Sequence, residues 1–170
     1  QRQMCIRDRR LESAVAQQGA RRRRLLALPG ARGPRRHGRR RVERHAEAER
    51  ALEDGCQELD MVVNISRVMS GDWDYVQADI AAVIEPAHAA GQKVKVIFEN
   101  CYLEESHKKS LCELCNELNA DWIKTSTGFG SSGATMDDLK LMCQHAAEHV
   151  QVKAAGGVRD LDSVLAIRSL

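Results

Sequence analysis

Four apolar stretches recur between residues 58 and 154, and each precedes a segment whose apolar residues are spaced as on one face of a helix. The stretches begin near residues 58, 93, 121 and 150, and the first runs over residues 58–65. β-Branched residues are common in them, as is typical of strands. Strands that alternate with helices at roughly 30-residue intervals are joined as parallel neighbours by right-handed crossovers. The pattern therefore predicts an α/β fold built on a parallel sheet.

The helices are marked by apolar spacing and by capping residues. Residues 72–90 and 104–118 carry apolar side chains at spacings of three and four, which predicts two helices. Pro86 is expected to shorten or kink the first of them. Thr135 and Asp160 are placed to cap the next two helices with their side-chain oxygens.

The polar residues of these four units gather on the strands and just after the carboxyl ends of the strands. In (β/α) barrels the residues that carry the chemistry lie at that end. We therefore expect a parallel fold of the TIM-barrel type. An open, doubly wound sheet is the alternative, although the sequence has no G-x-G-x-x-G turn to support a dinucleotide site in one.

Charge divides the chain into two unlike parts. The whole chain has a net charge of +2, but residues 1–50 hold 16 arginines, no lysine and five acidic residues, which gives +11. Residues 51–170 hold the other 10 basic and 19 acidic residues, which gives −9. We expect residues 1–41 to be an Arg-rich disordered segment, because they have too few apolar groups to offset the entropy of ordering. A folded domain is expected over residues 42–170, beginning with an alanine-rich helix that Gly55 ends.

Two further interpretations of residues 1–41 stay open. Clustered arginines can bind nucleic acid through its phosphate backbone, although no interleaved aromatic residues accompany them here. Arginine, alanine and glycine crowded together without lysine are also what GC-rich DNA yields when it is translated in the wrong frame. The segment is therefore a candidate for an out-of-frame sequence.

Membrane and metal functions find little support in the sequence. There is no run of about 18 apolar residues to span a membrane, and the N-terminus lacks the apolar core of a signal peptide. A cytoplasmic location with reduced cysteines is therefore expected. Cys112 and Cys115 form a lone C-x-x-C within a helical pattern, with no second pair to complete a zinc site.

Two lysines inside apolar strands are the main chemical signal. Lys124 lies between Ile123 and Thr125, and Lys153 occupies a matching place in the next strand. Both are followed by small residues and glycines. Burying a lysine is costly unless its charge is paired or removed. The two lysines therefore indicate amine chemistry at the mouth of a barrel, with the alternative that both simply reach solvent at the strand ends.

Four segments resemble, in the same order, the deoxyribose-phosphate aldolase family. They are Glu58-Leu-Asp-Met-Val-Val-Asn64, Lys95-Val-Ile-Phe-Glu-Asn-Cys-Tyr-Leu103, Lys124-Thr-Ser-Thr-Gly-Phe-Gly130 with Gly133-Ala-Thr135, and Val152-Lys-Ala-Ala-Gly-Gly-Val-Arg159. The resemblance covers about residues 45–170 and implies a (β/α)₈ barrel, of which only about the C-terminal half is expected in this partial sequence. It implies the reversible cleavage of 2-deoxy-D-ribose 5-phosphate to D-glyceraldehyde 3-phosphate and acetaldehyde, in deoxyribonucleotide catabolism.

The resemblance also implies roles for individual residues. Lys124 would form the Schiff base, Lys153 would be the second lysine beside it, and Asp60 would be the carboxylate of a proton relay, with no metal or other cofactor. The physical chemistry agrees, because an amine attacks a carbonyl only when neutral, and a free lysine, with a pKa of about 10.4, is almost wholly charged at neutral pH. A second ammonium nearby and desolvation both favour the neutral amine.

Gly128, Gly156 and Gly157 are expected to bind the phosphate, since backbone N–H groups in a glycine-rich turn before a helix can hold an anion. No nucleic-acid or membrane partner is expected for the enzyme, and its full-length relatives are expected to be homo-oligomers. The partial chain is expected to be far less active than such a relative. Two alternatives stay open: a nucleic-acid-binding protein that uses the Arg-rich segment, and another class I aldolase.

Overall fold

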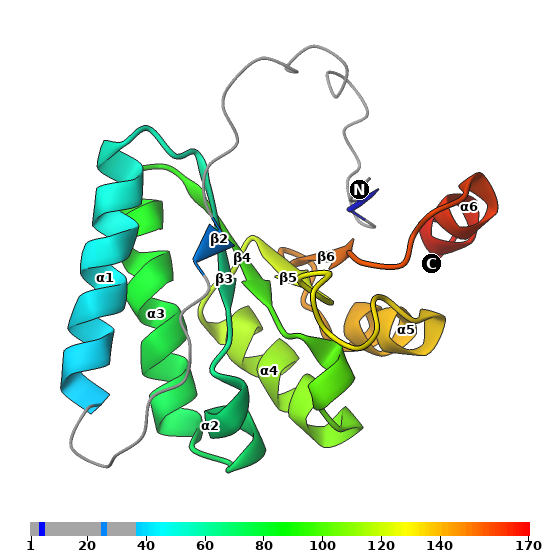
Figure 1. The fold of residues 1–170 in the computed structure, drawn as a ribbon, viewed down its shortest axis with the longest axis horizontal. Helices are drawn as coiled ribbons and strands as arrows, with labels where there is room; N and C mark the ends of the chain where they lie inside the picture. The colour runs from blue at the N-terminus through cyan, green and yellow to red at the C-terminus, as the bar shows by residue number, and fades with distance from the viewer. Residues whose placement is uncertain (1–3, 6–24, 27–36) are drawn as a thin grey trace.

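A six-stranded sheet forms the centre of the molecule (Figure 1). The structure is a computed structural model that describes residues 4–5, 25–26 and 37–170. The order of the strands is β1-β6-β5-β4-β3-β2, and the four longer strands are parallel to one another. These four are β3 (Glu58–Val62), β4 (Lys93–Ile97), β5 (Trp122–Lys124) and β6 (Gln151–Ala154). The predicted parallel α/β sheet is confirmed, with its strands at the predicted places.

Helices alternate with the strands along the chain and lie around the outside of the sheet (Figure 1). They are α1 (His37–Glu53), α2 (Ile65–Met69), α3 (Trp73–Ala89), the 3₁₀ helix η1 (Asn100–Tyr102), α4 (Glu105–Glu117), α5 (Met136–His145) and α6 (Leu161–Arg168). The predicted caps are confirmed. Thr135 Oγ1 accepts a hydrogen bond from the backbone N–H of Asp138 at 3.1 Å, and Asp160 Oδ1 accepts one from Ser163 at 2.7 Å.

The structure differs from the hydrophobic pattern at two places. Pro86 does not shorten α3, which continues to Ala89, because a proline in the last turn costs only one helical hydrogen bond. The predicted strand over residues 58–65 ends at Val62 instead. The side chain of Asn64 then caps α2 by accepting a hydrogen bond from the N–H of Arg67 at 3.3 Å.

The prediction of disorder for residues 1–41 falls mostly outside the described residues. The described parts of this segment are β1 (Met4–Cys5), β2 (Leu25–Leu26) and the start of α1 at His37. β1 pairs with β6 in the antiparallel sense, whereas β2 pairs with β3 in the parallel sense. β2 and α1 therefore have the chain order of a further βα unit before β3. The helix of this unit was predicted from residue 42 and begins at His37, whereas the strand was not predicted.

The central strands have one apolar face and one polar face, because successive side chains of a strand point to opposite sides. The apolar face is buried and forms the core with the helices: Leu59, Met61, Val94, Val96, Ile123 and Val152 are at most 2% exposed. The polar face carries Asp60, Lys95, Lys124 and Lys153 at the alternate positions. The helices thus hold the sheet from one side, and the charged residues face the other. Among the described helices, none is long and apolar enough to cross a membrane.

Candidate active site

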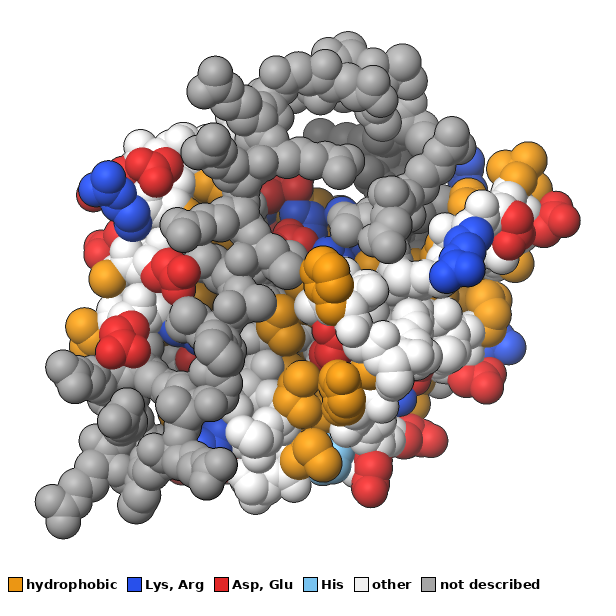
Figure 2. All heavy atoms as spheres, in the orientation of Figure 1, with side chains coloured by type: hydrophobic (Ala, Val, Ile, Leu, Met, Phe, Trp, Pro, Cys, Tyr) orange, Lys and Arg blue, Asp and Glu red, His pale blue; other side chains and the backbone are white. Residues whose placement is uncertain are grey.

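The strand register brings the charged residues of the polar face together. Asp60 on β3 is the Cα partner of Lys95 on β4, and Lys124 on β5 is the partner of Lys153 on β6. Lys and Asp or Glu side chains meet near the middle of the molecule in the space-filling view (Figure 2). Three predicted site residues therefore lie in one cluster: Asp60, Lys124 and Lys153.

Lys124 is the most buried charged residue of the cluster, with 1% of its surface exposed. Its Nζ donates a hydrogen bond to Asp60 Oδ2 at 2.8 Å. A buried ammonium group is tolerated when a carboxylate both pairs with its charge and accepts a hydrogen bond from it. The alternative that Lys124 escapes to solvent at the strand end is therefore wrong.

Lys95 is a second buried lysine of the cluster, and it was not predicted as a site residue. It is 4% exposed, its Nζ lies 3.2 Å from Asp60 Oδ1, and it donates a hydrogen bond to Glu58 Oε2. The same Nζ lies 5.0 Å from the centre of the Trp122 ring, within the range of a cation–π contact. The sequence does place Lys95 inside an apolar strand, as it does Lys124 and Lys153. No glycine-rich turn follows that strand, however, and this is why Lys95 was not selected.

Asp60 accepts contacts from two lysines at once, one through each carboxylate oxygen. Burial by itself would raise the pKa of Asp60, but the hydrogen bond from Lys124 and the charges of Lys95 and Lys124 outweigh burial and lower it. Asp60 is therefore a carboxylate at neutral pH. It accepts a hydrogen bond from Lys124 and has no proton to donate in return.

Lys153 is only partly buried, and its pKa is lowered from the usual lysine value. Burial is the main cause, and the charges of Lys95 and Lys124 add to it, while Asp60 and Glu58 act in the opposite direction. Lys95 and Lys124 are thus close enough to influence the protonation of Lys153. Lys153 gives up its proton more readily than a free lysine does.

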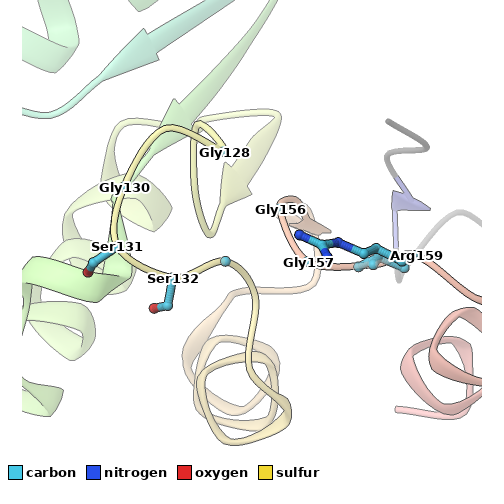
Figure 3. Close-up of a pocket in the computed structure, with 9 residues that line it drawn as sticks. Gly128, Gly130, Ser131, Ser132, Gly156, Gly157 and Arg159 are labelled. Atoms are coloured by element: carbon cyan, nitrogen blue, oxygen red, sulfur yellow. The ribbon is translucent and has the colours of Figure 1, made fainter.

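A glycine-rich pocket lies just beyond the ends of β5 and β6. Its lining consists of Gly128, Gly130, Ser131, Ser132, Gly133, Gly156, Gly157, Val158 and Arg159. All three predicted phosphate-binding glycines are in this lining. Arg159 was not predicted, and its side chain extends alongside Gly157 toward Gly156 (Figure 3). The pocket thus combines glycine-rich turns, in which backbone groups are accessible, with the guanidinium group of Arg159.

Two loops meet tightly in this pocket. A Cβ on Gly133 would lie 2.3 Å from the carbonyl carbon of Gly156, which leaves room only for glycine. The N–H of Ala134 donates to the carbonyl oxygens of Ala155 and Gly156, both at 3.1 Å. Gly156 also has a φ of +77°, a conformation that favours glycine. The loop that follows Lys124 is therefore fixed against the loop that follows Lys153.

The C-x-x-C pair lies in α4, away from the lysine cluster. Cys112 and Cys115 are both buried. Burial, with smaller contributions from Glu113 and Cys143, raises the pKa of Cys112 to about 12, and burial also raises that of Cys115 well above the usual value. Both remain thiols at neutral pH and pack in the core. Within the described residues, no group of three or more His, Cys, Asp or Glu side chains is arranged to hold a metal ion.

Comparison with known proteins gives a consistent match. Residues 4–167 match the model of the DeoC/LacD family aldolases. The chain is 68% identical over 125 residues to the deoxyribose-phosphate aldolase of Rhodopirellula baltica, covering 74% of this chain and 52% of that protein. It is 53% identical over 121 residues to the enzyme of Thermococcus gammatolerans, covering 71% of this chain and 54% of that protein. The chain thus spans about half the length of the curated relatives it matches.

Solved structures agree with the sequence matches. An aldolase named QR15 matches with a TM-score of 0.70 and 36% identity, covering 76% of this chain and 57% of that chain. The tetrameric deoxyribose phosphate aldolase of Aeropyrum pernix matches with a TM-score of 0.67 and 28% identity, covering 84% and 57%. The predicted TIM-barrel-type fold and the predicted family resemblance are confirmed by these matches.

Proposed function

Because this chain belongs to the DeoC/LacD aldolase family, we propose that it is a deoxyribose-phosphate aldolase. The proposed reaction is the reversible cleavage of 2-deoxy-D-ribose 5-phosphate to D-glyceraldehyde 3-phosphate and acetaldehyde. The observation that best supports it is a buried strand lysine, Lys124, whose Nζ contacts Asp60 at 2.8 Å at the end of the sheet that leads into a glycine-rich pocket.

In the proposed mechanism, Lys124 passes a proton to the solvent or to a neighbour and attacks the C1 aldehyde of the open-chain sugar. Loss of water gives an iminium, which accepts the electron pair of the C2–C3 bond as that bond breaks. The C3 hydroxyl loses its proton and becomes the aldehyde of glyceraldehyde 3-phosphate. The enamine left on Lys124 is protonated at C2 and hydrolysed to acetaldehyde.

Asp60 and Lys153 are the proposed proton-transfer groups. Asp60 contacts the Lys124 amine directly and is ionised at neutral pH, so it is the proposed carboxylate of a proton relay, in which it accepts hydrogen bonds from the groups through which protons move. Lys153 has a lowered pKa, so it gives up its proton more readily than a free lysine and is the proposed group that moves protons to or from the enamine carbon.

The pocket beyond the lysines is the proposed site of the phosphate. Gly128, Gly156 and Gly157 all have positive φ, which turns their backbone groups within short loops. Arg159 adds a guanidinium group that can pair with a phosphate, and α6 begins just after it at Leu161. Holding the phosphate there would place the other end of the sugar at the lysine cluster.

We propose a cytoplasmic enzyme of deoxyribonucleotide catabolism that forms a homo-oligomer, as the tetrameric aldolase of Aeropyrum pernix does. The iminium serves as the electron sink, so the proposed chemistry needs no metal or cofactor. A nucleic-acid-binding role for the Arg-rich segment would fall mainly on residues outside the described ranges.

The test is to incubate the chain with 2-deoxy-D-ribose 5-phosphate and sodium borohydride, and to map the product by mass spectrometry. A reduced, covalent sugar or ethyl adduct on a cluster lysine, together with release of acetaldehyde when borohydride is omitted, would support the proposal. If neither the adduct nor acetaldehyde is found, the proposed function is wrong. The same assay with unphosphorylated 2-deoxyribose measures how much the phosphate contributes.

A further inference from the structure

A buried acid, Glu99, lies immediately beyond β4 and is separate from the lysine cluster. Only 4% of its surface is exposed. Its backbone has a φ of +59° and a ψ of +59°, the left-handed conformation that residues other than glycine rarely adopt. An ionisable side chain that is both buried and held on a strained backbone needs specific partners to stay there.

The hydrogen bonds to the Glu99 carboxylate come from Thr127. The N–H of Thr127 lies 3.2 Å from each carboxylate oxygen, and the Thr127 hydroxyl donates to Oε2. An ionised carboxylate can only accept, so the hydroxyl proton of Thr127 is committed to Glu99. The same hydroxyl oxygen then accepts the N–H of Phe129 at 3.1 Å. Glu99 therefore fixes the first turn of the glycine-rich loop.

Further contacts join Glu99 to the middle of that loop. A Cβ on Gly130 would lie 3.1 Å from Glu99 Oε1 and 2.6 Å from Cys101 Sγ, so the loop packs directly on the residues that follow β4. On either side of Glu99, the N–H groups of Phe98 and Asn100 donate to the carbonyls of Lys124 and Thr125, both at 2.9 Å. The left-handed turn at Glu99 thus lies between two hydrogen bonds that join the ends of β4 and β5.

We infer that Glu99 is a positioning residue that anchors residues 127–133, the loop that forms one wall of the glycine-rich pocket, through its contacts with Thr127. The anchor acts at the pocket and leaves the lysine cluster unchanged, because Lys124 is held by Asp60 and by its own strand. The pocket's role as an anion site rests on the proposed function, whereas the anchoring of the loop does not.

The decisive variant is Glu99→Gly, because glycine accepts the left-handed backbone and removes only the side-chain anchor. Asn119→Gly is the matched control. Asn119 is the only other residue besides glycine with a positive φ in the described part of the chain, at +54°, and it lies in the turn between α4 and β5. Thr127→Val removes the hydroxyl that donates to Glu99, whereas Thr127→Ser keeps a hydroxyl at that position.

The first measurement is amide hydrogen exchange of Phe129 and Gly130 in the full chain. In Glu99→Gly and Thr127→Val these amides should exchange at least about tenfold faster, because Glu99→Gly removes the carboxylate that holds Thr127, and Thr127→Val removes the hydroxyl that joins Glu99 to the Phe129 N–H. Asn119→Gly and Thr127→Ser should match the parent chain. Unchanged exchange in Glu99→Gly would overturn the inference. If that variant fails to fold, Thr127→Val and Thr127→Ser decide the question by the exchange of Gly130, because Thr127→Val removes the acceptor of the Phe129 N–H directly.

The second measurement separates the anchor from the proposed function. Inorganic phosphate is titrated while the amides of Gly156 and Gly157 are followed by NMR, and borohydride trapping with acetaldehyde reports the lysine cluster. Glu99→Gly should weaken phosphate binding about tenfold and leave trapping within about twofold of the parent. Equal losses in both assays would overturn the inference. If the parent chain binds no phosphate, the proposed anion site is wrong, and the exchange measurement still decides whether Glu99 anchors the loop.

Discussion

Lys124 and Lys153 are neighbours in the sheet, yet their surroundings differ. Lys124 is 1% exposed and its Nζ is paired with Asp60, whereas Lys153 is partly exposed and forms no ion pair with any residue that the structure describes. The strand order explains the difference. Lys124 on β5 is two strands from Asp60 on β3, and Lys153 on β6 is three strands away, with strands about 4.8 Å apart. Only the nearer lysine reaches the carboxylate.

The comparison shows that one residue type in paired positions can have two different environments. The Nζ of Lys124 is held in place by its hydrogen bond to Asp60, while burial and two neighbouring charges lower the pKa of Lys153. The first property suits the residue that forms the imine, and the second suits a group that moves protons. The lowered pKa of Lys153 also makes it the competing candidate for the nucleophile, so the assignment needs a direct test.

Replacing Lys124 with arginine should have the largest effect on this comparison. With acetaldehyde and borohydride, the parent chain should carry a reduced adduct on Lys124, and Lys124→Arg should carry none, because a guanidinium stays protonated and cannot form the imine. Lys153→Met is the matched control and should still be trapped. Peptide mapping that places the adduct on Lys153 would reverse the assignment of the two lysines.

A large part of this arrangement was visible in the sequence. Lysines within apolar strands followed by glycines were enough to select Lys124 and Lys153, and the capping patterns at Thr135 and Asp160 located two helices. Periodicity also separates the polar face of each strand from its apolar face. These features depend on neighbours in the chain, which is why they could be predicted.

What the sequence could not supply depends on register between strands. That Lys95 shares Asp60 with Lys124 follows from the pairing of Asp60 with Lys95, which no local pattern encodes. β1 and β2 are two residues long and too short to show a period. The contact between Gly133 and Gly156 joins two loops whose approach depends on the whole sheet.

Gly133→Ala should separate the loop that follows Lys124 from the loop that follows Lys153. Its Cβ would lie 2.3 Å from the Gly156 carbonyl carbon, so one loop must move, at a cost of about 1–3 kcal/mol in the free energy of unfolding. The NMR chemical-shift changes that phosphate causes at the Gly156 and Gly157 amides should be lost in this variant. The control is Gly91→Ala, where φ is positive but nothing lies within 4 Å, so strain without a clash can be measured by chemical denaturation. Gly133→Ala behaving like the parent chain would contradict the tight contact.

The pH dependence of the free energy of unfolding should distinguish the contribution of Asp60 from that of Lys153, because the two groups titrate in different pH ranges. The folded-state pKa of Asp60 is below 3.8, so its stabilisation is present above 3.8 and is lost as the pH falls through the folded pKa. The folded-state pKa of Lys153 is below 10.5, so the folded chain binds fewer protons between those two values and stability rises with pH there. For either group, a tenfold difference in proton affinity between the folded and unfolded chain corresponds to about 1.4 kcal/mol of stability.

Urea unfolding across pH tests both windows. Asp60→Asn should flatten the acid side of the stability curve, and Lys153→Met should flatten the alkaline rise. If Lys153→Met retained the full alkaline rise, the cause would lie in another group of the cluster.

Glu58→Gln should give the smallest effect of these variants. It should change the pKa of Lys153 by removing a negative charge. Glu58 pairs with Lys95 and is one of the two acids that raise the pKa of Lys153, so removing its charge should lower that pKa further. Its side chain is 54% exposed, so solvent screening keeps the decrease small, as it does for other exposed pairs. NMR titration of ¹³Cε-labelled lysines measures the decrease, with Glu53→Gln on α1 as an exposed acid outside the cluster. A rise in the pKa of Lys153 would show that Glu58 acts through the position of Lys95 rather than through its charge.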